Sequence, residues 1–501
     1  MGLLDLPLEV LDEVIALSLP EGIEALAVTC KAVYQRAGSR IHQHNTLKRE
    51  WRHARITRSP QSNALHLLHA IDRTPLVADY IESLTLSEGT DTALIDANAG
   101  ASIDFRTQEE AMERIKSKVI ESGWAERAGV DSHEWWETLK NEDTLNAQDH
   151  DAEAPMCTVV ALLAQLPNLT TLRLSPAWST FGRYVETDQI TQNMLAILGV
   201  MVEHANAGNE PSRPLAKLTT VLPFMPEGYE ERAGLQALQP FMPLESLKQL
   251  YAVSCIAVDD GYTGIPFAWR SRGQICSLTR IELAYCCMDA EGISALISRT
   301  PYLEVFKYSH QTKWHGCLHD WNPGTFNAAL AQHCGQTINE LALTIDTLYG
   351  DIENGASSFL SFPNLQRLEV DVLIFCGPPV ESGQRRGTNG TLPSGQKPWN
   401  HEDIPCIGSM LPDNIVEVHI NTDYPDPDEH ALFALLKNIK PQRAERLKKL
   451  DKVIIRQAGA DTARKMVEKA EVTLVVFSEE DVSRDMLPQW KRDFASRVGG
   501  I

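Results

Sequence analysis

The residue types that could bind a metal gather between positions 310 and 334 of this 501-residue chain. His310, His315, Cys317 and His319 supply imidazole and thiolate groups, which zinc prefers as ligands in proteins. Their spacing matches no familiar zinc finger, and two neighbouring tryptophans indicate a packed loop. We therefore predict no metal site. A metal protein or an enzyme that uses this loop stays open as an alternative reading.

Other sequence patterns that carry chemistry are absent. The sequence contains no Gly-x-x-x-x-Gly-Lys-Ser/Thr loop for phosphate, no His-Glu-x-x-His motif and no Gly-x-Ser-x-Gly turn. The neighbours Cys286 and Cys287 end a predicted strand, and Cys286 occupies a core position of its apolar pattern. We expect no enzyme activity and no bound cofactor.

The overall composition excludes several classes of partner. A net charge of -21 disfavours binding to nucleic acid or to anionic membranes, which requires clustered Lys and Arg. Ten cysteines without a C-x-x-C pair show no disulfide framework, which favours a reducing compartment. The acidic N-terminus differs from a signal peptide, and the apolar run at 195–202 is too short to span a membrane. We expect a cytoplasmic or nuclear protein.

Basic residues are concentrated near the N-terminus. Between positions 30 and 58 the sequence has eight Lys or Arg residues and one acid, Glu50. Such a stretch fits docking to an acidic partner, where charge mainly speeds the encounter. A solvated helix face would give the same pattern.

One short phrase recurs from about residue 80 onward: an apolar residue, two others, an apolar residue, one other, and an apolar residue. Clear copies begin at Leu169, Leu278, Leu303, Ile338, Leu365, Ile415 and Leu450, and weaker ones lie at 81–86, 215–221, 247–253 and 472–477. Each copy predicts a short strand. The copy at 278–283 leads into 289–297, where Ile293, Leu296 and Ile297 share one helix face. We predict an α/β fold of stacked strand–helix units with irregular insertions; a generic α/β domain with buried strands is the alternative.

The first forty residues predict three short helices. Pro7 suits a first helical turn, where its missing N–H leaves no hydrogen bond unmade. Val10, Leu11, Val14 and Ile15 fall on one face of the helix that follows. Three short helices are too few to bury a good core alone, so we expect a partner to cover part of this apolar surface. An ordinary helical cap on the next domain is the alternative.

These two patterns resemble known families. The N-terminal residues are similar to an F-box in its fungal form, through Leu6-Pro7-Leu8-Glu9-Val10-Leu11, Ile15, Leu19, Leu26, Val28 and Cys30-Lys31. Many F-boxes carry a Trp shortly after the Cys-Lys pair, where this chain has Ala32, Val33 and Tyr34. The recurring phrase, extended through Cys286, resembles the leucine-rich repeat.

The resemblance to F-box proteins with leucine-rich repeats implies a substrate receptor of a cullin-based ubiquitin ligase. The N-terminal module would then bind a Skp-type adaptor and, through it, a cullin. The adaptor-binding residues implied are Leu6, Pro7, Val10, Leu11, Ile15, Leu19, Leu26, Cys30 and Lys31. A repeat scaffold that binds proteins without any ligase is the alternative function.

A leucine-rich-repeat solenoid places parallel strands on its concave face and helices outside. The strand positions between the apolar ones would then face a target protein of unknown identity. These candidate target-binding residues are Arg173, Arg280, Glu282, Glu304, Lys307, Glu340, Arg367, Glu369, Glu417 and His419.

The predicted domain order follows from these segments. We expect an F-box-like module at 1–48, a helical linker at 49–80, a solenoid at 81–477 and a helical tail at 478–501. Two insertions interrupt the solenoid. Residues 101–155 are acidic, and three tryptophans there (124, 135 and 136) either pack onto the body or anchor a partner. Residues 377–405 have the composition of a flexible loop.

Overall fold

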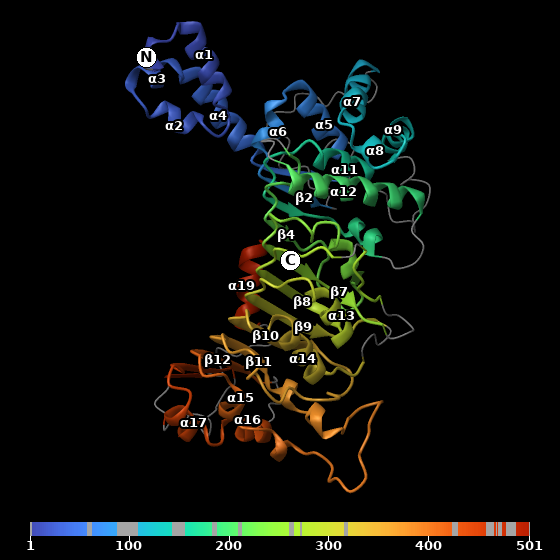
Figure 1. The fold of residues 1–501 in the computed structure, drawn as a ribbon, viewed down its shortest axis with the longest axis vertical. Coiled ribbons are helices and arrows are strands. Elements are labelled where there is room, and N and C mark those ends of the chain that lie inside the picture. The colour runs from blue at the N-terminus through green and yellow to red at the C-terminus, as the bar shows by residue number, and fades with distance from the viewer. Residues whose placement is uncertain are drawn as a thin grey trace. The chain divides into compact units, whose positions relative to one another are not determined.

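The computed structural model describes the chain in segments that form two compact units. The described residues are 3–57, 63–87, 109–142, 156–182, 188–208, 213–259, 265–270, 273–314, 319–422, 429–456, 465–466, 468, 473–476 and 487–499. The first unit comprises residues 1–177 and 188–221, and the second comprises 178–187 and 222–501. Figure 1 shows the helices and strands of both units.

Four helices open the first unit, one more than the sequence predicted. They are α1 (Leu8–Leu17), α2 (Ile23–Ala27), α3 (Lys31–Arg36) and α4 (Gly38–Trp51), after a single 3-10 turn, η1 (Leu3–Asp5). Leu11, Ile15, Ile23 and Ala37 form a small buried core among them. The module therefore has an apolar interior of its own, built from two residues of α1, one of α2 and one at the junction of α3 and α4.

The first unit also contains a parallel sheet with the strand order β1-β2-β3-β4. Its elements are β1 (His53–Thr57), α5 (Ala64–Arg73), α6 (Leu76–Tyr80), β2 (Ser83–Ser87), α11 (Cys157–Leu163), β3 (Thr171–Arg173), α12 (Gln189–Ala207) and β4 (Thr220–Leu222). Strand β1 lies beside β2, with Ala54 opposite Leu84 and Ile56 opposite Leu86. The segment 49–80, which we expected to be a helical linker, contains α5 and α6 and also strand β1, which belongs to the sheet.

The acidic insertion forms three helices in the first unit. They are α7 (Glu109–Glu121), α8 (Trp124–Arg127) and α9 (Ser132–Lys140). Trp124, Trp135 and Trp136 are all buried. Of the two interpretations offered for these tryptophans, packing onto the body is the one that holds. The ends of the insertion, at 101–108 and 143–155, lie outside the described residues.

The second unit is built around parallel strands in the order β6-β8-β9-β10-β11-β12-β13-β14. These strands are β6 (Gln249–Val253), β8 (Arg280–Met288), β9 (Val305–Gln311), β10 (Glu340–Thr347), β11 (Arg367–Asp371), β12 (Glu417–Asn421), β13 (Lys452–Arg456) and β14 (Thr473–Val476). Two further strands are β5 (Ala233–Gly234) and β7 (Cys255–Ala257). The α-helices are α13 (Ala290–Ile297), α14 (Pro323–Cys334), α15 (Ile407–Met410), α16 (Glu429–Leu436), α17 (Ile439–Glu445) and α19 (Gln489–Val498). Short 3-10 helices are η3 (Pro176–Gly182), which begins at the end of the first unit, η4 (Leu235–Leu238), η6 (Val372–Phe375), η7 (Val380–Ser382) and η8 (His401–Asp403).

Side chains of these strands alternate between the two faces of the sheet. The apolar positions of the recurring phrase, such as Phe306 and Tyr308, point toward the helices, and Tyr308 packs on Phe326 of α14 at 4.7 Å between ring centroids. The intervening positions point the other way. In Figure 1, α13 and α14 lie on one side of the second unit's strands and α19 lies on the other. We call the side covered by α19 the α19 face.

Asp and Asn residues begin several helices and explain where the helices start. Asp289 accepts a hydrogen bond from the backbone N–H of Gly292 at the start of α13, and Asn322 accepts one from Thr325 at the start of α14. Asp188 does the same for α12 and Asp131 for α9. These side chains satisfy backbone N–H groups that have no partner within the helix.

The strand positions predicted from the recurring phrase are confirmed. Each clear copy overlaps a strand from β3 to β13, and the weaker copies overlap β2, β4, β6 and β14. The prediction of an α/β fold with parallel strands is confirmed as well. The segment 377–405 contains only the short turns η7 and η8, and its backbone closes on itself through Arg385 and Thr391. Within the described residues no helix is both long and apolar enough to span a membrane.

Candidate protein-binding surfaces

The N-terminal helices bury some of the residues that were predicted to bind an adaptor. Leu11 is 4% exposed and Ile15 is 1% exposed, and both pack inside the module against Ile23 and Ala37. The prediction that Leu11 and Ile15 belong to the contact surface is therefore wrong, because folding of the module already buries them. They belong to the core that supports the exposed residues of the module.

A second apolar stripe on α1 remains open. Val10 is 45% exposed and Leu17 is 77% exposed. With half-buried Val14 they are spaced i, i+4 and i+7, which places them on one side of the helix. The sequence pattern groups Val10 and Val14 with Leu11 and Ile15 and does not single out Leu17, because the pattern alone does not show which stripe turns inward.

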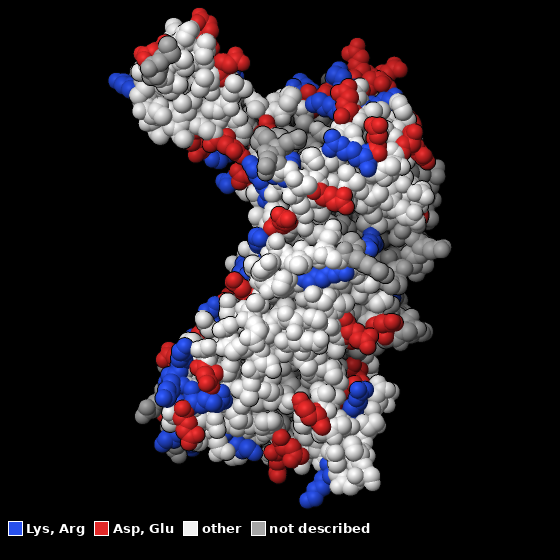
Figure 2. Space-filling model, in the orientation of Figure 1, with Lys and Arg blue, Asp and Glu red and all other residues white. Residues whose placement is uncertain are grey.

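Exposed apolar side chains are concentrated in this module. Fifteen large hydrophobic residues among the described residues are exposed, and six of them lie between positions 4 and 34. The six, which we call the N-terminal apolar surface, are Leu4, Leu8, Val10, Leu17, Val28 and Tyr34. In Figure 2 most of the visible surface of α1 to α4 carries neither basic nor acidic side chains. Exposed apolar groups collected in one small module are typical of a protein-binding site.

The other predicted adaptor-binding residues lie at the edges of this surface. Pro7 and Lys31 are exposed, whereas Leu6 and Cys30 are half-buried. Leu19 and Leu26 are half-buried against the module's core.

An ion pair holds α1 and α3 together beside the N-terminal apolar surface. Arg36 donates hydrogen bonds from Nε and Nη2 to the two carboxylate oxygens of Asp12, both at 2.6 Å. Lys48 and Arg52 pair with Glu24 and Glu82. Several residues of the basic stretch at 30–58 are therefore neutralised within the first unit, which weakens the expectation that the stretch as a whole meets an acidic partner.

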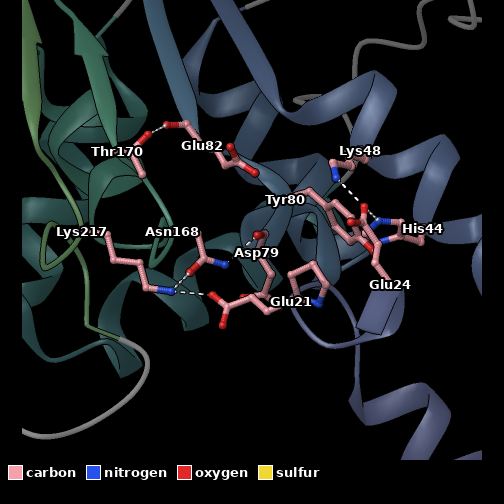
Figure 3. Close-up of a pocket in the computed structure, with 11 residues that line it drawn as sticks. Glu21, Glu24, His44, Lys48, Asp79, Tyr80, Glu82, Asn168, Thr170 and Lys217 are labelled. Carbon is pink, nitrogen blue, oxygen red and sulfur yellow. Dashed lines mark hydrogen bonds and ion pairs between the residues drawn. The ribbon is translucent and has the colours of Figure 1, made fainter. Parts of the chain in front are cut away.

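A polar pocket of about 250 Å³ lies where the N-terminal helices meet the sheet of the first unit (Figure 3). On one side, Glu24 accepts a hydrogen bond from Lys48 at 2.6 Å. Nε2 of His44 lies 3.1 Å from the same carboxylate oxygen. On the other side, Lys217 bridges Glu21 at 2.5 Å and Asn168 at 2.7 Å. Charges of opposite sign thus pair with one another on each side of the pocket.

The charged and polar groups of this pocket interact with one another and connect the helices around it. The hydrogen bond from Lys48 is the main reason that the pKa of Glu24 is below its usual value, with His44 adding to the effect. Burial, and next the negative charge of Glu21, raise the pKa of Asp79. Burial raises the pKa of Tyr80 to about 12, and its hydroxyl lies 2.9 Å from Nδ1 of His44. The pocket is lined by residues of α2, α4 and α6 and by the segments that lead into β2, β3 and β4, and it fixes how the N-terminal helices join the sheet.

The α19 face of the second unit carries a row of polar and apolar residues in register. Across five neighbouring strands, Tyr251 pairs with Glu282, Glu282 with Lys307, Lys307 with Ala342, and Ala342 with Glu369. Three of these are predicted target-binding residues, so the sequence pattern placed them correctly on one side of the sheet. It did not show what covers that side.

Helix α19 covers these residues. Glu282 is fully buried, and Lys307 and Glu369 are each 7% exposed. The prediction that they are free to contact a target is therefore wrong for the chain in this state. Signals for the covering helix were present in the sequence, because Trp490, Phe494 and Val498 repeat every four residues in the predicted tail.

The remaining predicted target-binding residues are spread more widely. Arg280, Glu340, Arg367 and Glu417 occupy the next row at the strand starts, where Arg367 forms an ion pair with Glu340. His419 lies in β12, with Nε2 at 2.5 Å from Glu417. Glu304 is exposed just before β9. Arg173 belongs to β3 of the first unit, where burial lowers the pKa of its guanidinium.

His310, one of the residues considered for metal binding, packs inside the second unit. His310 is fully buried and stacks on Trp321 with ring centroids 4.5 Å apart. His315 and Cys317 lie outside the described residues, and among those described no group of three His, Cys, Asp or Glu residues could hold a metal ion. Cys286 and Cys287 are both buried, and neither takes part in a disulfide.

No protein-family model matches the chain, and no curated protein matches it.

Proposed function

We propose that this protein is a substrate receptor of a Skp–cullin–F-box ubiquitin ligase. In this proposal the N-terminal apolar surface binds a Skp-type adaptor, and the adaptor joins the chain to a cullin. The second unit, with its solenoid of leucine-rich-repeat-like strands, recognises the target protein. The receptor performs no covalent step and accelerates ubiquitin transfer by holding the target close to the charged ubiquitin carrier.

The observation that carries this proposal is the concentration of exposed apolar side chains in one small module. The module has its own core around Leu11 and Ile15, so Val10 and Leu17 are not needed for that core and stay in solvent. Leaving such residues exposed is unfavourable unless a partner covers them. The resemblance of residues 6–31 to an F-box supplies the identity of the proposed partner.

The ion pairs of the pocket between the N-terminal helices and the sheet support the idea that the receptor holds its target in a fixed position. Ion pairs from Lys48 to Glu24 and from Lys217 to Glu21 tie α2 and its preceding loop to α4 and to the segment that leads into β4. A receptor that works by positioning needs such a fixed joint, because free rotation would lower the effective concentration of the target.

Co-purification with a Skp-type adaptor tests the proposal. The chain should recover the adaptor, and Leu17→Asp should abolish recovery without changing the melting temperature, since Leu17 is exposed. Leu360→Asp is the matched control, because Leu360 is 52% exposed in the second unit. It should retain binding.

The outcome separates the proposal from its alternatives. If the wild-type chain recovers no adaptor, or if Leu17→Asp and Leu360→Asp behave alike, the ligase role is refuted. A repeat scaffold without ligase association would then be the better description, provided that the second unit still binds a protein.

A further inference from the structure

Helix α19 contacts the second unit's sheet through one continuous side. Trp490, Phe494 and Val498 join the buried cluster of Tyr251 and its neighbours on the α19 face. At 100° per residue these three side chains span one narrow stripe of the helix. Lys491 borders the stripe on one side and Arg497 on the other.

Residues of the sheet form ion pairs with both borders of that stripe and a hydrogen bond with a residue between them. Arg497 donates to both carboxylate oxygens of Glu282, at 2.8 and 3.1 Å. Lys491 on the opposite border pairs with Asp346 of β10. Between the two ion pairs, the indole N–H of Trp490 donates to the hydroxyl of Thr344 at 3.1 Å.

The start of α19 is also held by the sheet. The carboxylate of Glu369 accepts hydrogen bonds from the backbone N–H groups of Gln489 and Trp490, at 2.8 and 3.0 Å. These are N–H groups that a helix cannot satisfy internally. Glu369 therefore recognises the beginning of any helix that lies in this place, whatever its side chains.

The contacts of α19 resemble those of a docked ligand. The hydrogen bonds described between α19 and the strands each use at least one side chain, and the helix adds no strand to the sheet. The residues that it covers include Glu282, Lys307 and Glu369, the positions that the repeat geometry assigns to target recognition. The acidic residues that α19 contacts (Glu282, Asp346 and Glu369) and the apolar stripe beneath it together specify a basic amphipathic helix.

We infer that the α19 face is a binding site for a basic amphipathic helix of the target protein, and that α19 occupies this site within the chain. The ligand has an aromatic residue, a second aromatic residue four positions later and an aliphatic residue after a further four. Basic residues follow the first aromatic residue directly and precede the aliphatic one. The target helix must displace α19 to bind. Helix α19 therefore competes with the target and raises the target concentration that binding requires. This inference names the target class within the proposed function and rests on that proposal only in calling the ligand a target.

A peptide-binding experiment on the full-length chain tests the inference. The double variant Trp490→Ala/Arg497→Glu weakens α19 while leaving every residue of the α19 face unchanged. A labelled synthetic peptide with the wild-type sequence 487–499 should bind this variant saturably, and the wild-type chain should bind the peptide at least about tenfold more weakly, because its own α19 fills the site.

Two controls make the result specific. Arg492→Glu introduces the same charge change on the exposed side of α19, where Arg492 bonds only within the helix to Gln489 in the described structure. It should leave peptide binding as weak as in the wild type. A peptide with Arg497→Glu should bind the double variant poorly, because its glutamate would face Glu282.

Hydrogen exchange of the same variant completes the test. The inference requires that residues 489–498 lose protection while β8, β9 and β10 keep theirs. It is overturned if the strands lose protection together with α19, because α19 would then be an integral part of the core. It is also overturned if the released variant binds the peptide no better than the wild type does. No adaptor is present in this experiment, so its failure would leave the adaptor-binding proposal to stand or fall separately.

Discussion

Arg497 donates two hydrogen bonds to the buried carboxylate of Glu282, although 215 positions separate the two residues in the chain. Arg280 in the same strand also pairs with Glu282. A carboxylate without solvent access needs such partners, since removing it from water costs far more than one hydrogen bond returns. The C-terminal helix thus balances a charge in the middle of the second unit.

Arg497→Met should lower the free energy of unfolding by about 1–3 kcal/mol, because the buried carboxylate of Glu282 would lose one of the two arginines that pair with it. Chemical denaturation measures this change. Arg492→Met, in the same helix but exposed, should change stability by less than about 0.5 kcal/mol. Equal effects of the two substitutions would show that the pair contributes nothing to stability.

Leu11→Ala and Leu17→Ala should differ sharply although both lie in α1. Leu11 is 4% exposed, so its truncation should destabilise the N-terminal helices by about 2–4 kcal/mol. Leu17 is 77% exposed, and its truncation should be nearly neutral. Hydrogen exchange of residues 8–41 measures the stability of the module directly. The reverse order would contradict the division of α1 into a core stripe and an open stripe.

Asp79→Asn should stabilise the chain at neutral pH, and the gain should shrink in acid. Burial, followed by the charge of Glu21, raises the pKa of Asp79 above its usual value of 3.8. The folded state therefore binds the proton of Asp79 more tightly than the unfolded state does. This contribution to stability is present below the unfolded pKa and is lost as pH rises through the folded pKa.

Melting temperatures of wild type and Asp79→Asn measured from about pH 4 to about pH 7 check this sign. The difference in favour of the Asn variant should grow as pH rises, because Asn does not titrate. A constant difference across that range would mean that burial does not disfavour the charged form of Asp79.

Gly292→Ala should destabilise the second unit although Ala is usually the better helix former. A methyl group on Gly292 in α13 would lie 2.0 Å from the carbonyl oxygen of Ala257 in β7. Relieving that overlap should cost about 1–3 kcal/mol. Gly199→Ala in α12 has no atom within 4 Å of the added methyl and should instead stabilise by about 0.5–1 kcal/mol. Thermal unfolding of both variants compares the two signs.

The sequence predicted the strands well because each copy of the recurring phrase is a local signal. Apolar positions at fixed spacing, such as Ile281 and Leu283, determine which side of a strand is buried. Strand β1 was missed because it offers only Ala54 and Ile56 as inward residues, between basic and polar ones. A weak alternation of that kind also suits a helical linker.

The candidate surfaces were harder to predict than the elements that carry them. On α1 two apolar stripes lie side by side, and only the positions of α2 and α3 decide that Leu11 turns inward and Leu17 outward. On the second unit the repeat pattern placed Glu282 and Glu369 on the correct side of the sheet. Their burial depends on a helix more than one hundred residues away, for which no local pattern specifies a partner.

The most direct test of the account is a hydrogen-exchange comparison of the full-length chain alone and with an excess of a purified Skp-type adaptor. We predict that protection increases in the segment 3–34, which contains Leu4, Val10 and Leu17, while β8 to β11 and α19 stay unchanged. The absence of any protection in segment 3–34, or protection confined to the second unit, would contradict the proposal that the N-terminal module is the adaptor-binding site.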